Sequence, residues 1–268
     1  MEVPTLVGAH AVAPYTISLS SYDHLPGLGL LPVNAFVIHA AQPVLVDTGL
    51  AARRGPFLDA LRSVVDPAAL RWIWLSHIDA DHVGNLPEVM ALAPQAKVVT
   101  SYLGVGKMGL RGFDTSRVHM LEPGAVIDAG DRTLVPLKPV YYDAPETMGF
   151  LDTRTRVLFA ADAFGAPLQK PEQEAAAIPS DELFEGMATW AALDAPMLGT
   201  SDRQVLHRLF AAVEQINPAA IISAHLPVAK RMTGRLLRLL DRALDSGRLP
   251  QPDWQCLARL ADQPALAA

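Results

Sequence analysis

Four side chains of metal-ligand type lie within six consecutive positions of the chain: His77, Asp79, Asp81 and His82. The apolar run at residues 70–75 comes directly before them and predicts a short buried strand, and the amphipathic stretch after Gly84 predicts a helix. The cluster therefore lies on a strand-to-helix turn, where side chains converge and a helix N-terminus favours anions. A surface turn that happens to carry these residues is the alternative, but candidate partners recur further along the chain. We interpret the cluster as part of a metal site.

Three further polar residues follow predicted strands. These are Asp47, Asp162 and His225, after the apolar runs Val44–Val46, Arg156–Ala161 and Ala219–Ala224. We interpret Asp162 as a second carboxylate that enters the same site, and His225 as a further ligand. Asp47 precedes Thr48 and Gly49. It is placed either to hold a metal-bound imidazole or to cap a helix, and the local sequence leaves both readings open.

Composition excludes several classes of protein. The formal net charge of −6 argues against a nucleic-acid partner, which favours a basic surface. The single cysteine, Cys256, rules out a disulfide framework and a thiolate metal site. The N-terminus lacks a basic region followed by an apolar run, and no apolar stretch approaches the roughly 18 residues that a membrane span needs. We therefore predict a cytoplasmic protein with no membrane partner.

The remaining patterns predict one α/β domain over residues 1–248, followed by a partly ordered tail at 249–268. Predicted strands cover residues 33–38 and 97–100, a hairpin covers 126–137, and predicted helices cover 56–65, 202–216 (capped by Ser201) and 229–244. Three segments are predicted without long helices or strands: a loop at 21–31, a mobile loop at 104–113, and loops with short helices at 166–198. His24, in the first of these loops, is a candidate for the mouth of the site.

The motif His-x-Asp-x-Asp-His, with an upstream Asp-Thr-Gly and a later strand-terminal Asp and His, resembles the metallo-β-lactamase fold. The matching residues, from Asp47 through the His77–His82 motif and Asp162 to His225, span most of the chain. This resemblance implies a four-layer αββα sandwich with a two-metal site at one edge of its sheets.

Within that superfamily the sequence is most similar to the β-lactamase-like domain of flavodiiron proteins and to single-domain oxygen-binding di-iron proteins. Asp79 stands where most hydrolases of the fold carry His and where the di-iron branch carries a carboxylate, usually Glu. Residues 157–165 also resemble that branch, as does Pro145-Glu146-Thr147-Met148, which is similar to its Pro-Asp-Ser-Met. Two features depart from the family. Asp143 occupies the position of a family His, with Glu146 as a nearby alternative ligand, and there is no flavodoxin domain, so we expect no FMN in this chain.

The resemblance implies a complete set of ligands. One metal ion would be held by His77, Asp79 and Asp143, the other by Asp81, His82 and His225, and Asp162 would bridge the two. Asp47 and Glu146 would lie behind these ligands. Four carboxylates balance the charge of two divalent cations, and hard oxygen donors with a few imidazoles favour iron or manganese, although zinc stays open because of its high intrinsic affinity.

Two kinds of chemistry remain open. A di-iron centre would bind or reduce dioxygen or nitric oxide, with electrons from a separate donor protein. A di-metal centre with zinc would instead hydrolyse an ester, lactone, thioester or phosphodiester through an activated water. Asp79 and Asp143 favour the first, because carboxylates make a metal ion less Lewis-acidic and easier to oxidise. A binding or sensing protein without turnover is the third alternative, and the resemblance also implies a homodimer.

Overall fold

The computed structural model describes residues 8–249, in which the first half of the chain forms one mixed sheet. Its strands lie in the sheet in the order in which they occur in the sequence: β1 (Gly8–Ala13), β2 (Thr16–Leu25), β3 (Gly29–Ile38), β4 (Val44–Val46), β5 (Trp72–Trp74), β6 (Lys97–Thr100) and β7 (Val118–Met120). Strands β1 to β4 pair antiparallel, whereas β4 to β7 pair parallel. The parallel strands therefore bring their carboxyl ends to one edge.

The second half of the described chain forms the other sheet. Its strands lie in the order β13-β12-β11-β10-β9-β8, with bounds β8 (Ile127–Asp128), β9 (Thr133–Leu137), β10 (Gly149–Asp152), β11 (Val157–Phe159), β12 (Ala220–Ser223) and β13 (Leu226–Lys230). Only the β11–β12 pair in this sheet is parallel. A parallel pair needs a long crossover, and here the crossover contains two helices.

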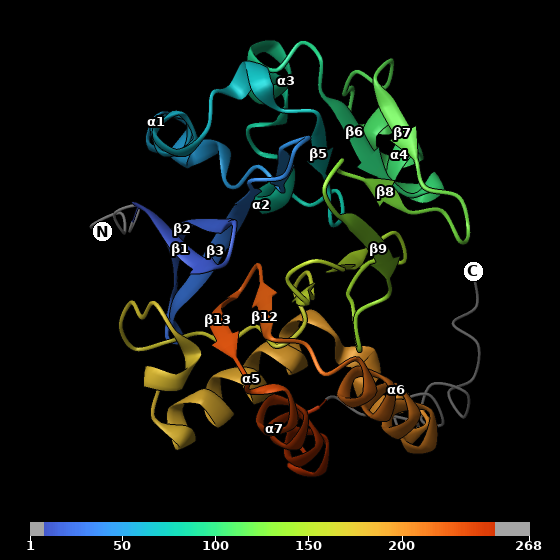
Figure 1. Cartoon of the computed structure of the whole chain (residues 1–268). Coiled ribbons are helices and arrows are strands. Elements are labelled where there is room, and N and C mark those ends of the chain that lie inside the picture. Colours follow the sequence, from blue (N-terminus) through green and yellow to red (C-terminus); the bar gives the residue numbers. More distant parts are fainter. Residues whose placement is uncertain (1–7, 250–268) are drawn as a thin grey trace, which may run out of the picture.

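Helices cover the outer faces of both sheets. The connections between strands of the first sheet contain α1 (Arg54–Val64), α2 (Ala80–Val83), α3 (Leu86–Leu92) and α4 (Tyr102–Leu110). In the second sheet, α5 (Ser180–Asp194) and α6 (Arg203–Ile216) connect β11 to β12, and α7 (Thr233–Asp245) follows β13. Short 3₁₀ helices lie at Ala51–Arg53, Pro67–Ala69, Ala175–Ala177 and Pro196–Thr200. Figure 1 shows α1 and α3 on one side of the strands and α5, α6 and α7 on the opposite side.

Three apolar layers hold these elements together, and strand alternation explains how. Leu45 points from β4 towards α1 and α3, while its neighbours Val44 and Val46 point towards the second sheet. Between the sheets, Trp74 meets Phe150 edge to face, with ring centroids 4.9 Å apart. The molecule is therefore a four-layer αββα sandwich, which confirms the predicted fold class.

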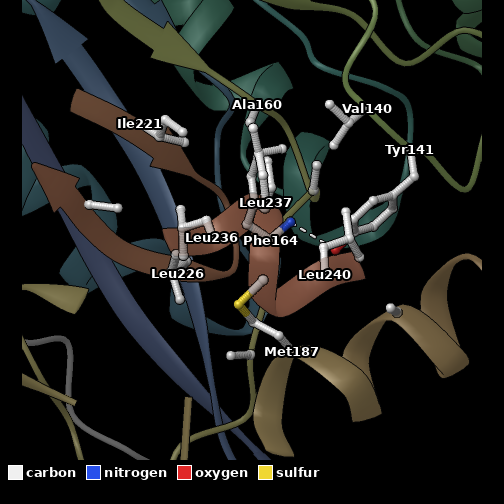
Figure 2. Packing of buried hydrophobic residues seen from close by; sticks show 14 of the residues in the cluster. Val140, Tyr141, Ala160, Phe164, Met187, Ile221, Leu226, Leu236, Leu237 and Leu240 are labelled. Atoms are coloured by element: carbon white, nitrogen blue, oxygen red, sulfur yellow. Dashed lines mark hydrogen bonds between the residues drawn. The ribbon is translucent and has the colours of Figure 1, made fainter. Parts of the chain in front are cut away.

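The third apolar layer lies between the second sheet and its helices. Figure 2 shows Leu236, Leu237 and Leu240 of α7 packed around Phe164, which follows β11. The backbone N–H of Phe164 donates to the hydroxyl oxygen of buried Tyr141 over 2.7 Å. This layer fixes the turn that contains Asp162.

The predicted loop at 21–31 is wrong, because these residues form the end of the β2–β3 hairpin. The ladder continues through the pairs Asp23–Leu31, His24–Leu30 and Leu25–Gly29. Gly27 and Gly29 both have positive φ, so the chain reverses in a tight turn that only glycine adopts easily. The glycines that suggested an extended loop instead shorten it.

The predicted mobile loop at 104–113 is also wrong, since most of it lies in α4. Ser101 caps this helix by accepting a hydrogen bond from the Gly104 amide over 3.3 Å. A Cβ at Gly104 would collide with the Thr100 side chain, so this glycine permits close packing of α4 against β6. Tertiary packing overrides the weak helix propensity of glycine here.

Three predictions in the second half need correction. The segment 166–198 contains the long helix α5 as well as loops and short helices. Asp202, and not Ser201, caps α6 by accepting from the amides of Gln204 and Val205. Residues 226–230 form β13, so the last helix begins at Thr233. The predicted tail lies outside the described residues from position 250 onward, and within residues 8–249 no helix is long and apolar enough to span a bilayer.

Candidate metal centre

The candidate site lies where the parallel strands of the two sheets end. Backbone bonds join the loops that follow these strands: the amide of Asp47 donates to Trp74 O over 2.8 Å, and the amide of Ala224 donates to Ala161 O over 2.8 Å. Asn34 of β3 links the two sheets, because its backbone amide donates to Ala224 O over 2.9 Å and its side-chain amide donates to Ser223 O over 3.0 Å. These loops are therefore connected to one another by hydrogen bonds on the inner side of the site.

Two imidazoles and one carboxylate define the imidazole-rich position, which consists of Asp81, His82 and His225, and Asp162 adds a second carboxylate to it. The Nε2 atoms of His82 and His225 lie 3.3 and 3.4 Å from Oδ2 of Asp81. They lie 3.3 and 3.5 Å from Oδ1 of Asp162. These donor atoms surround a common point.

The carboxylate-rich position lies beside it and is defined by His77, Asp79 and Asp143. Nε2 of His77 is 4.0 Å from Oδ2 of Asp79 and 3.8 Å from Oδ2 of Asp143. It is 3.4 Å from Oδ2 of Asp162. The two oxygens of Asp162 thus face different donor groups, which is the arrangement that a bridging carboxylate requires.

The spacing of these donors fits a pair of metal ions. Two ligands bound at about 2.1 Å, at angles between square and tetrahedral, lie roughly 3.0 to 3.4 Å apart. The separations at the imidazole-rich position, 3.3 to 3.5 Å, lie at the upper end of this range, and those at the carboxylate-rich position, 3.4 to 4.0 Å, lie somewhat above it. His82 Nε2 and Asp162 Oδ1 are buried and have no hydrogen-bond partner among the described residues. Such atoms are costly unless a ligand satisfies them, so the residues fit a resident metal pair.

Hydrogen bonds behind the imidazoles direct their Nε2 atoms into the site. Nδ1 of His82 lies 2.9 Å from Oδ2 of buried Asp47, and Nδ1 of His225 lies 2.7 Å from the carbonyl oxygen of Pro32. Ser76 donates to the Asp47 carboxylate through its amide over 2.7 Å and through its hydroxyl over 2.8 Å. Bonds of this kind fix the tautomer and the orientation of metal-binding histidines.

Asp47 caps no helix, although the sequence left this reading open: its carboxylate accepts from Ser76 and contacts His82. Its φ is +56°, a left-handed conformation that Asp tolerates better than most residues. Ala161, directly before Asp162, has φ of +48°. Backbone strain therefore lies on both sides of the site, as is common where a structure holds functional side chains in place.

Burial and mutual charge shift the pKa values of the imidazoles in different directions. Burial lowers the pKa of His77 well below its ordinary value, and it lowers that of His225 to about 4. Burial acts in the same sense on His82, but the carboxylates of Asp81, Asp162 and Asp47 outweigh it and raise the pKa of His82. His77 and His225 are therefore held neutral, the form that binds metal ions.

The pKa values of the carboxyl groups are shifted as well. Burial raises the pKa of Asp162 well above its ordinary value. Burial and the Asp79 carboxylate raise the pKa of Asp143. Burial also opposes ionisation of Asp81, but the His82 imidazole more than compensates and lowers its pKa. Concentrated negative charge without a cation is thus unfavourable at this site.

Two of the residues predicted near the site lie apart from its donor atoms. Glu146 is completely buried, and its Oε1 lies 2.5 Å from Nζ of Lys107 in α4. Asp143, and not Glu146, therefore faces His77. His24 is exposed on β2, and its amide donates to the Asp23 side chain and not to a residue of the cluster.

The sequence reading missed two residues of α5. Trp190 donates from Nε1 to the carbonyl oxygen of Asp162 over 3.2 Å, and its ring centroid lies 4.7 Å from that of His225. Asp194, one turn later, has a carboxylate oxygen within 4.8 Å of those of Asp143 and Asp162. A lone acidic residue in the last turn of a predicted helix would have been the available signal, because the helix dipole disfavours it there.

A cavity of about 420 Å³ opens next to the carboxylate-rich position. Asp143 lies in its wall, together with Tyr142 and the apolar face of α6 that includes Val205 and Leu209. The cavity is large enough for a small organic molecule.

Comparison with known proteins places the chain in a family. Residues 28–225 match the model of the metallo-beta-lactamase superfamily, so the chain belongs to this superfamily. Its relatives there include flavodiiron proteins and rubredoxin-oxygen oxidoreductase, which confirms the resemblance drawn from the sequence. The chain is 30% identical over 180 residues to Type A flavoprotein fprA of Rhodobacter capsulatus, an alignment that covers 62% of this chain and 40% of the relative.

A second relative is rubredoxin-oxygen oxidoreductase of Megalodesulfovibrio gigas, 26% identical over 160 residues that cover 59% of this chain and 40% of the relative. The matched part is thus well under half the length of either relative. Among solved structures, rubredoxin oxygen:oxidoreductase from Desulfovibrio gigas superposes with a TM-score of 0.77 at 21% identity, covering 88% of this chain and 61% of that one. The flavodiiron protein from Giardia intestinalis gives a TM-score of 0.76 at 17% identity, covering 90% and 60%. These superpositions support the fold.

Proposed function

We propose that this protein holds two iron ions, one in each position, and binds or reduces dioxygen or nitric oxide with electrons from a separate donor protein. The observation that carries the proposal is the placement of Asp162, whose Oδ2 faces His77 while its Oδ1 faces His82 and His225. A carboxylate divided in this way between two donor groups is what a two-metal centre needs.

The donor set supports iron. Imidazoles come from His77, His82 and His225, and four carboxylates complete the two positions. Oxygen-rich sites favour iron and manganese, whereas zinc is commonly held by more nitrogen or sulfur. Asp79 replaces the imidazole that most hydrolases of this fold carry, and Asp143 adds another carboxylate. Both substitutions favour redox chemistry over hydrolysis.

Iron in this pair would supply the electrons and the open coordination sites for a diatomic ligand. The protein's own contribution is to orient the ligands and to limit access. Asp47 and Ser76 hold His82 in position, and the Pro32 carbonyl holds His225. Trp190 packs against His225 and closes the α5 side, while Asp79, with 45% of its side chain exposed, marks the open side.

The relatives support the same direction of chemistry. One of them is named rubredoxin-oxygen oxidoreductase, and another is named a flavo-diiron protein. We place the electron donor in a separate protein, and we retain the cytoplasmic location and the homodimer as proposals. Size-exclusion chromatography with light scattering tests the homodimer directly.

The first experiment is elemental analysis of protein purified without oxygen from cells supplied with both iron and zinc, with absorption spectra before and after air. About two irons per chain, and a near-ultraviolet band that appears on oxidation, are expected. Asp162→Ala is the matched variant, and it should contain neither metal. Two zincs and an unchanged spectrum would contradict the iron proposal and favour the hydrolytic alternative, to be tested with esters, lactones and phosphodiesters.

A further inference from the structure

Helix α5 points its C-terminal end at the candidate metal centre. Trp190 anchors the last turn through its bond to the Asp162 carbonyl. Asp194 is the last residue of the helix, and one of its carboxylate oxygens lies within 4.8 Å of carboxylate oxygens of Asp143 and Asp162. The side chain is thus carried to the site by a rigid element, and not by a loop.

One oxygen of the Asp194 carboxylate lacks a hydrogen-bond partner among residues 8–249. This atom, Oδ2, is buried, and in residues 8–249 no lysine, arginine or histidine forms an ion pair with the carboxylate. Asp162, its neighbour, is 3% exposed and also has an unpartnered oxygen, Oδ1. Oδ1 of Asp162 faces the imidazole-rich position, so Asp162 and Asp194 each bring an unpartnered oxygen to the two-metal centre as a whole.

Electrostatics make this arrangement unfavourable without a cation. The C-terminal end of a helix carries partial negative charge, so an acidic residue there is disfavoured. Partial burial removes solvation, and the adjacent carboxylates of Asp143 and Asp162 add repulsion. A bound metal ion would compensate for these costs, because its positive charge attracts all of these carboxylates.

We propose that Asp194 is a further metal ligand at the carboxylate-rich position, and that it makes this position selective for manganese or iron over zinc. The inference rests on the proposed two-metal centre. Asp194 would join this position through Asp143 and Asp162, whose carboxylate oxygens lie within 4.8 Å of its own, while His77 and Asp79 group with Asp143 and not directly with Asp194. The position would then draw on five protein donors. Five donors suit an ion that binds five or six ligands, whereas four donors suffice for tetrahedral zinc.

The charge of the site supports the same conclusion. Asp79, Asp81, Asp143, Asp162 and Asp194 bring five negative charges to the two positions. Two divalent cations bring four positive charges, so an excess of negative charge remains. This excess favours an ion that reaches the trivalent state, as iron and manganese do and zinc does not.

The test compares Asp194→Asn with Asp181→Asn in the metal-depleted full chain. Asp181 lies in the first turn of the same helix and is exposed, so its substitution removes the same charge away from the site. Manganese binding is followed by the electron paramagnetic resonance of free Mn²⁺, and zinc is measured by competition. We expect Asp194→Asn to weaken one of the two manganese sites at least about tenfold, by analogy with substitutions around known metal ligands.

The decisive quantity is the ratio of manganese to zinc affinity at the weakened site. Asp194→Asn should lower this ratio, and Asp181→Asn should leave it unchanged. An unchanged ratio, including a loss of both metals by one factor, would overturn the role of Asp194. Asp194→Ser provides the same comparison if the Asn variant does not fold. Wild-type protein that binds no metal pair would instead overturn the two-metal centre itself.

Discussion

Asp47→Asn is the substitution that tests the organisation of the metal centre most sharply. In the folded protein, Oδ2 of Asp47 lies 2.9 Å from Nδ1 of His82 and accepts its proton. When a metal ion displaces the second proton of His82, this bond keeps the remaining proton on Nδ1 and leaves Nε2 free to bind the ion. Asn has nearly the same shape and also tolerates the positive φ of this position, so the backbone should not change.

The amide changes the direction of the hydrogen bond. Oδ1 of Asn can still accept from the Ser76 amide, which places its NH₂ group at the former Oδ2 position, facing His82. An NH₂ group can only donate, so Nδ1 of His82 must become the acceptor and the ring proton moves to Nε2. The protonated Nε2 then cannot bind metal without a further, unfavourable rearrangement.

The expected loss is 10–100-fold in affinity at the imidazole-rich position, the usual effect of altering a group behind a metal ligand. This corresponds to about 1.4–2.8 kcal/mol. Asp152→Asn is the control, because Asp152 is equally buried and bonded to Arg132, but contacts no ligand. It should lower the melting temperature without changing metal affinity.

Metal titration of the depleted protein measures the affinity, and nitrogen NMR of labelled histidine reports the His82 tautomer. The expected outcome is one weakened metal site together with a proton on Nε2. If Asp47→Asn binds both metal ions as tightly as the wild type, Asp47 does not control His82 through this bond. Weakened binding with an unchanged tautomer would likewise contradict the reasoning.

Three further substitutions test other parts of the structure. Asp162→Ala should remove both metal ions in elemental analysis, and retention of two tightly bound ions would exclude a bridge. Asp143→His should keep two metals but raise zinc affinity relative to manganese, measured by competition, since it adds an imidazole; an unchanged ratio would place Asp143 away from the metal. Lys107→Met should lower the free energy of unfolding by roughly 1–3 kcal/mol in urea denaturation, because it removes the ion-pair partner of buried Glu146 and leaves only the charge interaction with Lys138. No measurable loss would show that the Lys107–Glu146 pair does not stabilise the fold.

The sequence predicted the parts of the site that follow buried strands. Apolar runs before His77, Asp162 and His225 locate strand ends, and the structure brings these three side chains together. Local patterns suffice here because a parallel strand places its terminal residue at a shared edge. The same argument located Asp47, although only the structure distinguishes its bonds to Ser76 and His82 from a helix cap.

Other features depend on contacts between distant segments, which a local pattern does not contain. The glycines at 104–113 suggested a mobile loop, but packing against Thr100 stabilises α4. Glycines at 27 and 29 suggested a long loop, but they form a tight hairpin turn. The sequence did not predict Asp194, because its neighbouring carboxylates come from two other segments, around Asp143 and Asp162.

The two candidate metal positions differ in ways that suit different tasks. Buried His82 and His225 serve the imidazole-rich position, each held by a hydrogen bond from behind. The carboxylate-rich position has one imidazole. Its Asp79 has the most exposed side chain of the seven ligands that the sequence predicted. An open position with many oxygen donors favours higher oxidation states and access for a small ligand, while a closed position with fixed imidazoles favours constant occupancy. We therefore expect dioxygen or nitric oxide to approach from the side of Asp79.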